Sequence, residues 1–148
     1  MRLRYTRLSD RAFPPLKSRI EDAGIDFKCS EPVEWIERGD GSYYAIARTD
    51  VAIEIPRSYY LQTAPRSSML FNHNVAVFAS VIDTGYTGEI TFLLHYLGSG
   101  TPPPLDRGTK VAQCVLVQVP MIDTEFEEVD VLPEYSDRGN KGFGSSGS

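Results

Sequence analysis

The chain has 148 residues, a mass of 16.5 kDa, a formal net charge of −5 and a sequence pI near 5.0. This length favours a single domain that buries roughly 68–70% of the surface exposed by the unfolded chain. The acidic balance argues against binding to nucleic acid, and no apolar run approaches the ~20 residues of a membrane span. Because the N-terminus lacks the apolar core of a secretion signal, we expect a cytoplasmic protein, or a host-cytoplasmic one if the source is viral.

Short runs of alternating apolar and polar residues recur along the chain and predict β-strands. They lie at residues 3–8, 51–55, 90–97 and 111–119. In the last run we expect Val111, Val115, Val117 and Val119 to share one face before Pro120 ends the strand. Ten prolines and twelve glycines punctuate the chain, at the roughly 8–12-residue spacing of a β-sandwich or barrel. The sequence therefore predicts an all-β domain without a long helix.

The C-terminal part of the chain changes in composition. Residues 125–137 form an acidic connector, and residues 138–148 contain four glycines that leave little chance of helix or strand. We therefore predict a β domain over residues 1–137 and a flexible glycine-rich arm over residues 138–148. The arm carries cations, hydroxyls and one ring, which suit the wrapping of phosphates and a base. A disordered polar tail is the alternative that its composition leaves open.

Four further segments combine turn residues with polar side chains. They are residues 23–26 with Asp26, residues 64–68 with Arg66, Ser67 and Ser68, residues 81–88 with Asp83 and Tyr86, and residues 106–113 with Gln113. An arginine beside two hydroxyls is suited to phosphate oxygens. Taken singly, each segment also fits an ordinary turn aspartate, a core ring or a buried amide.

Taken together and in this order, the segments resemble the five motifs of the trimeric dUTPases (deoxyuridine triphosphate nucleotidohydrolases). The motifs read DAGIDFKCS, APRSSML, SVIDTGYTGEI, RGTKVAQ and RGNKGFGSSG, and the resemblance extends from about Arg19 to the end. It implies a jelly-roll-like β fold assembled as a homotrimer, with each active site built by all three subunits. It also implies Mg²⁺-dependent hydrolysis of dUTP to dUMP and pyrophosphate, which keeps uracil out of DNA and supplies dUMP for thymidylate synthesis.

The resemblance implies a role for each site residue. Asp83 is the expected general base that activates a water for attack on the α-phosphorus, and Asp26 is expected to reach Mg²⁺ through a water. Tyr86 is expected to pack on the deoxyribose where a 2′-OH would lie.

The resemblance also assigns residues to the phosphates and the base. The phosphate chain is assigned to Ser67 and Gln113, with Arg66 and Ser68 beside them. Uracil is assigned to the backbone of residues 78–86, including Ser80, Val81 and Ile82. In the arm, Phe143 is expected to cover uracil, Arg138 to bind the γ-phosphate, and Lys141, Gly144, Ser145 and Ser146 to lie near the phosphates.

The chain departs from the family pattern in a few places. Ser80 stands where a glycine commonly precedes Val-Ile-Asp, Asn72 where a lysine is frequent, and Tyr59-Tyr60 where a turn usually contains glycine.

Two alternative functions remain. The related dCTP deaminases carry an arginine where this chain has Phe71 and a glutamate base where it has Leu93, and leucine cannot shuttle a proton. The other alternative is a nucleotide-gated binding protein with a regulatory protein partner.

Overall fold

The computed structural model describes residues 1–120 and 124–131, and this part of the chain consists of ten strands and one short helix. The elements are β1 (Arg4–Arg7), β2 (Gly24–Lys28), β3 (Ile36–Glu37), β4 (Tyr43–Arg48), β5 (Val51–Glu54), β6 (Tyr59–Ala64), α1 (Ser67–His73), β7 (Val75–Val77), β8 (Val81–Ile82), β9 (Thr91–Tyr96) and β10 (Lys110–Gln118). The predicted all-β, jelly-roll-like class is confirmed. No helix within residues 1–120 or 124–131 has the length and apolar character to cross a membrane.

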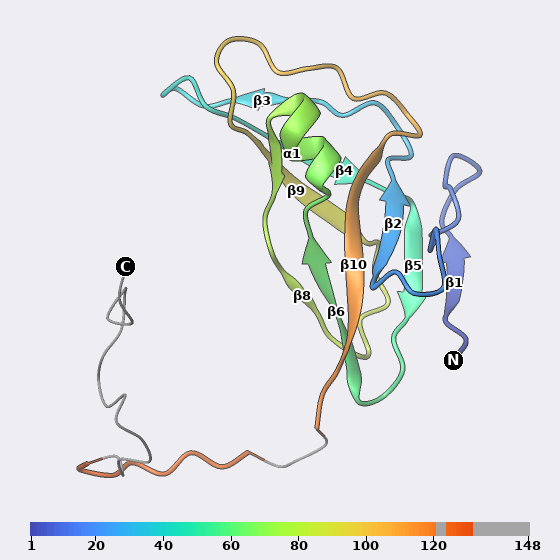
Figure 1. Cartoon of the computed structure of the whole chain (residues 1–148), viewed down its shortest axis with the longest axis vertical. Coiled ribbons are helices and arrows are strands. Elements are labelled where there is room, and N and C mark those ends of the chain that lie inside the picture. The colour runs from blue at the N-terminus through green and yellow to red at the C-terminus, as the bar shows by residue number, and fades with distance from the viewer. Residues whose placement is uncertain (121–123, 132–148) are drawn as a thin grey trace.

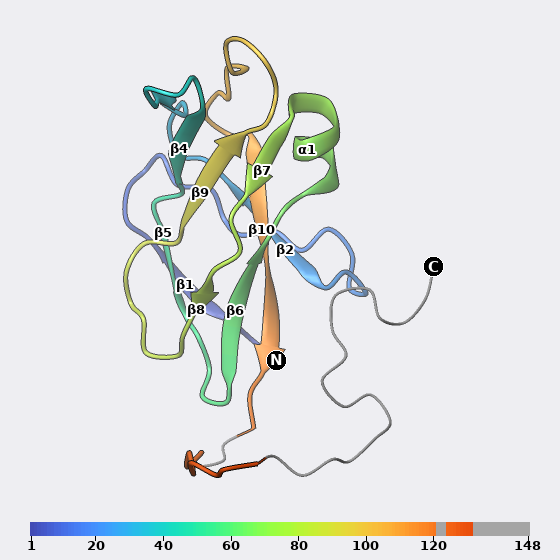
Figure 2. The same ribbon diagram turned by 90° about the vertical axis from the view of Figure 1, so that its left-hand side faces the viewer.

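The strands form two four-stranded sheets and a two-stranded ribbon (Figure 1). One sheet has the order β2-β10-β6-β8, the other β3-β4-β9-β7, and the ribbon pairs β1 with β5. Every strand pair is antiparallel. Figure 2 shows β4, β9 and β7 toward the viewer with β10 and β2 behind them. The architecture is therefore a sandwich, in which each sheet has one face toward the core.

The core lies between the two sheets and contains side chains of both. Phe27 of β2 and Phe92 of β9 meet with ring centroids 5.4 Å apart and tilted by 59°. Leu61, Leu94 and Cys114 are fully buried around them. Tilted aromatic pairs of this kind add to the stabilisation gained from burial alone. The alternating pattern of β9 is what supplies Phe92 and Leu94 to the core.

The expectation for the last strand is wrong in one respect. The register of β10 against β2 shifts between Lys110 and Ala112. After this irregularity Ala112 and Cys114 are buried, whereas Val115 and Val117 are only half-buried on the other face. A β-bulge moves the following side chains to the opposite faces. Val111 at the bulge is fully buried, so the four valines do not share one face of β10.

The chain reverses just before β6 and not at Tyr59-Tyr60. Tyr59 donates its N–H to the Pro56 carbonyl over 3.2 Å, and Ser58 adopts a φ of +66°. Tyr59 is already the first residue of β6. A turn without glycine is possible here because an isolated left-handed residue is tolerated at a modest cost. The arm predicted over residues 138–148 lies outside the described residues.

Both cysteines are free and buried, and burial raises the pKa of each thiol, in Cys114 to about 12. At pH 8 the Cys114 thiolate fraction is then on the order of one in ten thousand. We expect both thiols to resist a thiol reagent such as DTNB in the native protein and to react promptly in denaturant. The rate of absorbance change measures this, and fast native labelling would contradict the burial of the two cysteines.

Candidate active site

A polar cavity of about 430 Å³ opens where β2, β10 and the start of α1 meet. Its lining combines two carboxylates, a guanidinium, an amide and three hydroxyls. They belong to Asp22, Asp26, Arg66, Gln113, Ser18, Ser67 and Ser68, with Gly24 at the wall. Three of the predicted motifs therefore come together in space. Such a set of donors beside carboxylates is suited to a phosphate chain with an associated cation.

The sheet register brings these motifs together. Gln113 on β10 lies opposite Asp26 on β2 and opposite Ala64 on β6. Directly opposed residues of an antiparallel pair point to the same face of the sheet. Since Pro65, Arg66 and Ser67 directly follow β6, the second motif leaves the sheet beside Gln113. Pairing alone thus assembles the cavity from segments that are far apart in the sequence.

Asp26 is held by two cations at the wall of the cavity. Its Oδ1 lies 2.9 Å from Arg66 Nε and its Oδ2 lies 2.8 Å from Lys110 Nζ. Arg66 also donates through Nη1 to the Lys110 carbonyl over 3.1 Å. The Asp26 side chain is only 11% exposed, so removing either cation would leave a nearly buried carboxylate incompletely paired. Sequence reasoning did not identify Lys110. Its only signal was a cation at the start of the strand that carries Gln113.

Gly24 makes room for the Gln113 amide. Gln113 donates through Nε2 to the Pro65 carbonyl over 2.9 Å. A Cβ at Gly24 would lie 1.9 Å from Gln113 Oε1, so no other residue fits without moving the amide. A glycine inside a strand commonly marks such a close approach. Gly24 is therefore a site residue that was recognisable in principle from the sequence but was not identified.

Ser67 and Ser68 open helix α1 at the mouth of the cavity. Both are exposed, and Arg66 before them has extended backbone angles with φ −98° and ψ 130°. Arg66 is half-buried and turned toward Asp26. The two hydroxyls are thus accessible to a ligand, whereas the guanidinium mainly orients Asp26.

Asp83 belongs to a second cavity of about 340 Å³. The lining residues are Ser80, Val81, Ile82, Asp83, Tyr86, Glu89 and Thr91. Tyr86 donates its N–H to the Asp83 carbonyl over 3.2 Å, and Gly85 between them has a φ of +86°. A positive φ at the third turn position requires glycine in practice. The turn therefore fixes the backbone of Asp83, whose side chain remains exposed.

The Tyr86 ring is folded back over the turn. Its hydroxyl donates to the Glu89 carbonyl over 3.0 Å. A Cβ at Gly88 would lie 2.4 Å from that hydroxyl, so the missing side chain of Gly88 creates the space for the ring. The ring is half-exposed and lines the same cavity as Asp83.

Glu89 ties the end of this turn to the corner between β4 and β5. Its carboxylate accepts the N–H groups of Thr49 and Asp50, both over 2.9 Å, and a guanidinium hydrogen bond from Arg48 over 2.6 Å. At the same corner the Ser9 hydroxyl, assisted by nearby arginines, holds the pKa of Asp50 below its usual range. Glu89 was not identified from the sequence, because its partners lie about forty residues away.

In the part of the chain that the structure describes, the two cavities share no lining residue. Ile82 pairs with Leu61, so continuing that register sets Asp83 near Tyr60, four residues along β6 from Ala64. At 3.3 Å per residue this separation is roughly 13 Å. Within one chain, the Asp26 and Gln113 group and the Asp83 turn therefore lie apart from each other.

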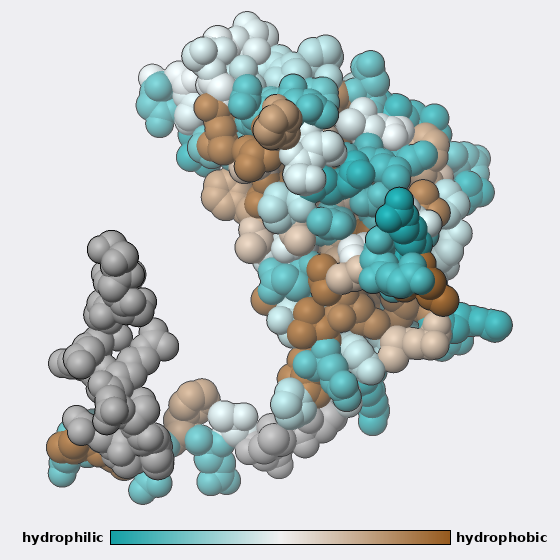
Figure 3. Space-filling model, viewed as in Figure 1, coloured by the Kyte–Doolittle hydropathy of each residue, from teal (hydrophilic) through white to brown (hydrophobic). Residues whose placement is uncertain are grey.

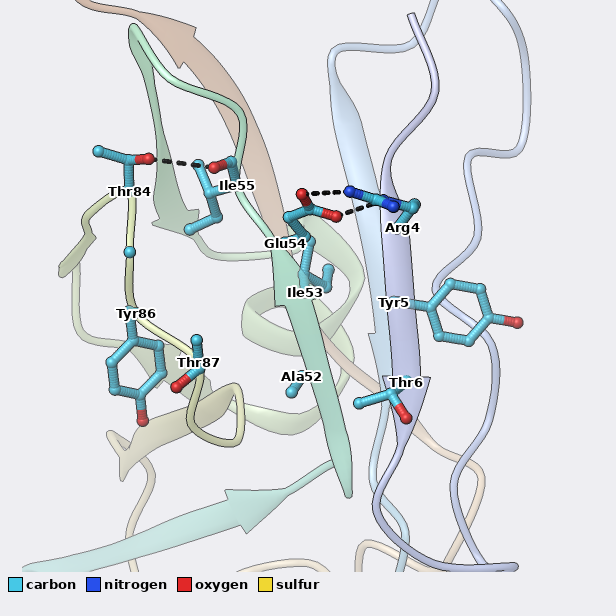
Figure 4. Close-up of a pocket in the computed structure, with 11 residues that line it drawn as sticks. Arg4, Tyr5, Thr6, Ala52, Ile53, Glu54, Ile55, Thr84, Tyr86 and Thr87 are labelled. Carbon is cyan, nitrogen blue, oxygen red and sulfur yellow. Dashed lines mark hydrogen bonds and ion pairs between the residues drawn. The ribbon is translucent and has the colours of Figure 1, made fainter.

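A larger cavity of about 620 Å³ lies between β1, β5 and the turn over residues 84–87 (Figure 4). Among residues 1–120 and 124–131, its only charged lining residues are Arg4 and Glu54, which are paired with each other. Thr84 at its edge donates to the Ile55 carbonyl over 3.1 Å. This cavity lacks unpaired cationic donors, so it does not suit a triphosphate.

Comparisons with known proteins identify the family of the chain. The sequence matches the dUTPase family model over residues 11–147. It is 36% identical over 149 residues to the deoxyuridine 5'-triphosphate nucleotidohydrolase of Gloeothece citriformis, covering 99% of this chain and 97% of that relative. The chain belongs to the dUTPase family.

Two further dUTPases are similar over nearly the whole chain. The Fowlpox virus deoxyuridine 5'-triphosphate nucleotidohydrolase is 34% identical over 150 residues, covering 95% of this chain and 94% of its own. The dUTPase of Staphylococcus bacteriophage 80alpha, solved with dUPNHPP, superposes with a TM-score of 0.81 at 25% identity, covering 99% of both chains. In this dUTPase, the first, second and fourth motifs line one cavity and the third lines another. The fifth motif, with Arg138, Lys141, Phe143, Gly144, Ser145 and Ser146, lies outside the described residues.

Replacing Gly24 by alanine should impair ligand binding more than folding. The added Cβ displaces the flexible Gln113 amide and breaks its hydrogen bond to Pro65, at a cost of about 1 kcal/mol. We expect the Tm to fall by only a few degrees and the affinity for a non-hydrolysable dUTP analogue to fall about tenfold, measured by calorimetry. Gly39→Ala is the control, because nothing lies within 4 Å of its added Cβ. Equal affinities for the two variants would show that Gly24 has no such role.

Proposed function

We propose that this protein hydrolyses dUTP to dUMP and pyrophosphate. The observation that supports this most directly is the polar cavity, in which Asp26, Ser67 and Gln113 of three dUTPase motifs lie together. The exposed Asp83 in the third motif supplies the remaining requirement, a carboxylate able to accept a proton. Membership of the dUTPase family supports the same reaction.

Asp83 is the proposed general base. Its carboxylate takes a proton from a water whose oxygen attacks the α-phosphorus, and the bond from that phosphorus to the bridging oxygen of the β-phosphate breaks. The products are dUMP and pyrophosphate. The glycine turn and the Glu89 anchor support this role, because they hold the backbone of Asp83 while its side chain stays accessible. The hydroxyls of Ser67 and Ser68 and the amide of Gln113 are the proposed phosphate-chain ligands.

We also propose that Mg²⁺ accompanies the triphosphate. Both oxygens of Asp26 already accept from cations, and the described residues contain no cluster of three or more metal-ligating side chains. This donor set fits a magnesium ion held by the phosphates and contacted by Asp26 through a water. When bound, the ion supplies positive charge that offsets the charge of the leaving pyrophosphate.

We propose that the backbone of residues 78–80 recognises uracil through hydrogen bonds. Ala79 is exposed, and no partner for its N–H or C=O lies within residues 1–120 and 124–131. A donor and an acceptor on one residue match a uracil edge, where N3–H donates and O4 accepts. Cytosine has an acceptor at N3 and a donor at N4, so it would face like groups.

We propose a homotrimer whose active sites combine half-sites of different subunits. The supporting observation within one chain is that Asp83 lies apart from the Asp26 cavity. An exposed apolar row also crosses the outer face of the β3-β4-β9-β7 sheet. Ile46, Leu93 and Phe78 are 56%, 41% and 51% exposed, and Ile46 is paired with Leu93. Such a row on a sheet face is typical of a surface that another chain covers.

Deamination is not supported by the residues at the deaminase positions. Leu93 lies on the outer face of β9 and lines neither half-site. Phe71, where the deaminases carry an arginine, is 90% exposed on α1. Neither side chain can transfer a proton, so the site is better suited to hydrolysis.

Pyrophosphate release across dUTP, dCTP, dTTP and UTP tests the proposed reaction. We expect turnover of dUTP to exceed that of the others, and Asp83→Asn to reduce dUTP turnover at least ~10²-fold because it removes the base. Asp83→Asn should bind the dUTP analogue as wild type does. Wild-type protein that binds the analogue but releases no pyrophosphate would refute hydrolysis and favour a regulatory binding role.

Mixing two inactive variants tests the shared site. Asp83→Asn lacks the base, and the double variant Ser67→Ala Gln113→Ala lacks phosphate ligands. The two variants are refolded together in equal amounts. A site then works only when its Asp26 cavity comes from an Asp83→Asn chain and its Asp83 turn comes from a double-variant chain. Random assembly of a closed trimer gives about a quarter of wild-type activity. If native mass spectrometry confirms mixed trimers but activity does not recover, the half-sites are not shared.

A further inference from the structure

The chain crosses from one sheet to the other at residues 78–80, and one buried hydroxyl binds both ends of this crossing. Val77 ends β7 in one sheet, and Val81 begins β8 in the other. Thr63 on β6 is 2% exposed, and its side chain points inward in step with Leu61. Ser80 donates its N–H to Thr63 Oγ1 over 2.6 Å, and Thr63 Oγ1 donates to the Phe78 carbonyl over 3.1 Å.

These contacts use the hydrogen-bonding capacity of the hydroxyl in a defined way. A threonine hydroxyl has one proton to donate and two lone pairs to accept with. It accepts from Ser80 N, and its single proton goes to Phe78 O, which is closer than the Ser80 carbonyl at 3.3 Å. The Ser80 carbonyl has other donors, namely Thr63 N at 3.0 Å and Gln62 Nε2 at 2.9 Å. Phe78 N–H is bound to the Leu93 carbonyl over 3.0 Å.

The planarity of the peptide bond carries this constraint to Ala79. In a trans peptide the C=O and the N–H of one unit point in opposite directions. The Phe78 carbonyl points to Thr63, so the Ala79 N–H of the same peptide points away from Thr63. The Ser80 N–H also points to Thr63, so the Ala79 C=O points away as well. One hydroxyl thereby turns a donor and an acceptor of Ala79 to the same side, where the described chain offers them no partner.

We propose that Thr63 is a specificity-determining positioning residue, whose buried hydroxyl orients the two peptide planes beside Ala79 for recognition of the uracil edge. This inference rests on the proposed dUTP hydrolysis and on base reading by Ala79. Thr63 does not touch the nucleotide. It acts through the backbone of the crossing segment, and Ser80 takes part because its N–H is one of the two groups held. No sequence motif of the site includes Thr63.

The orientation matters because uracil and cytosine differ in the direction of their hydrogen bonds. The Ala79 carbonyl accepts from uracil N3–H while the Ala79 N–H donates to an adjacent carbonyl oxygen of the base. Without the Thr63 hydroxyl, either peptide plane can rotate and present the opposite group. The loss of the hydroxyl should then weaken the preference for uracil over cytosine while the fold is retained, because the crossing remains attached through Leu93 and Gln62.

Thr63→Val removes the hydroxyl and keeps the shape of the side chain. We expect kcat/KM for dUTP to fall about threefold to tenfold, chiefly through KM, and the preference for dUTP over dCTP to narrow by a similar factor. Thr63→Ser restores the hydroxyl and should stay within about twofold of wild type for both quantities. An unchanged KM and an unchanged preference in Thr63→Val would overturn the proposal.

Thr49→Val is the matched control. Thr49 is fully buried, donates through Oγ1 to the Ile90 carbonyl over 2.6 Å and accepts from Val51 N over 3.2 Å. It lines neither half-site. Its valine variant should lose about as much thermal stability as Thr63→Val and keep the wild-type preference. A similar narrowing in both variants would show a general effect of destabilisation and overturn the positioning role.

Hydrogen exchange of the wild-type protein tests the same geometry without a variant and without turnover. In the free protein the Ser80 amide should exchange at least about tenfold more slowly than the Ala79 amide, because only Ser80 N–H is bonded. Adding dUMP should protect Ala79. Equal exchange of the two free amides, or no protection of Ala79 by saturating dUMP, would overturn the proposal. A wild-type protein with the expected exchange but no activity on dUTP would contradict the proposed reaction and leave the backbone geometry supported.

Discussion

The assembly of the polar cavity depends on the double pairing of β10. This strand is bonded to β2 on one side and to β6 on the other, so Gln113 has Asp26 and Ala64 as its two neighbours. Segments separated by more than eighty residues thereby become one row across a sheet. Backbone hydrogen bonds fix this row, and the Lys110 and Arg66 ion pairs then set the Asp26 carboxylate within it. The bulge near Lys110 belongs to the same arrangement, because it decides which β10 side chains face the cavity.

Alternation in the sequence predicted the strands whose surroundings are simple. The runs at residues 51–55 and 90–97 correspond to β5 and β9, and in β9 the burial alternates as the sequence pattern predicts. The same reasoning misassigned the valines of β10, because a bulge changes the phase of alternation and leaves no mark in composition. Helix α1 was not predicted within the second motif, since seven residues are too few to show a helical period.

The candidate site was predicted only in part, because several of its residues depend on partners that are distant in the sequence. Asp26, Arg66, Ser67, Gln113 and Asp83 belong to recognisable motifs, and they line two separate cavities of the structure. Thr63, Lys110 and Glu89 were missed because their partners are distant in the chain. For Thr63 one signal was available: a polar residue at a position where alternation with Leu61 demands an inward side chain. Such a residue needs a buried partner, but only the folded chain shows that the partner is the crossing segment.

The same crossing restricts how the length of this chain can vary. Val77 and Val81 belong to different sheets and are four residues apart, which spans at most about 13–14 Å. Packed sheets lie about 10 Å apart, so the crossing has almost no slack. Deleting a residue would leave a reach of about 10–11 Å, so the segment would have to be fully extended and its peptides could not turn toward Thr63. Inserting one would release the peptide that lies between Phe78 and Ser80. Insertions and deletions among homologues should therefore collect elsewhere, as in the proline-rich loop over residues 97–105, and this segment should keep a constant length.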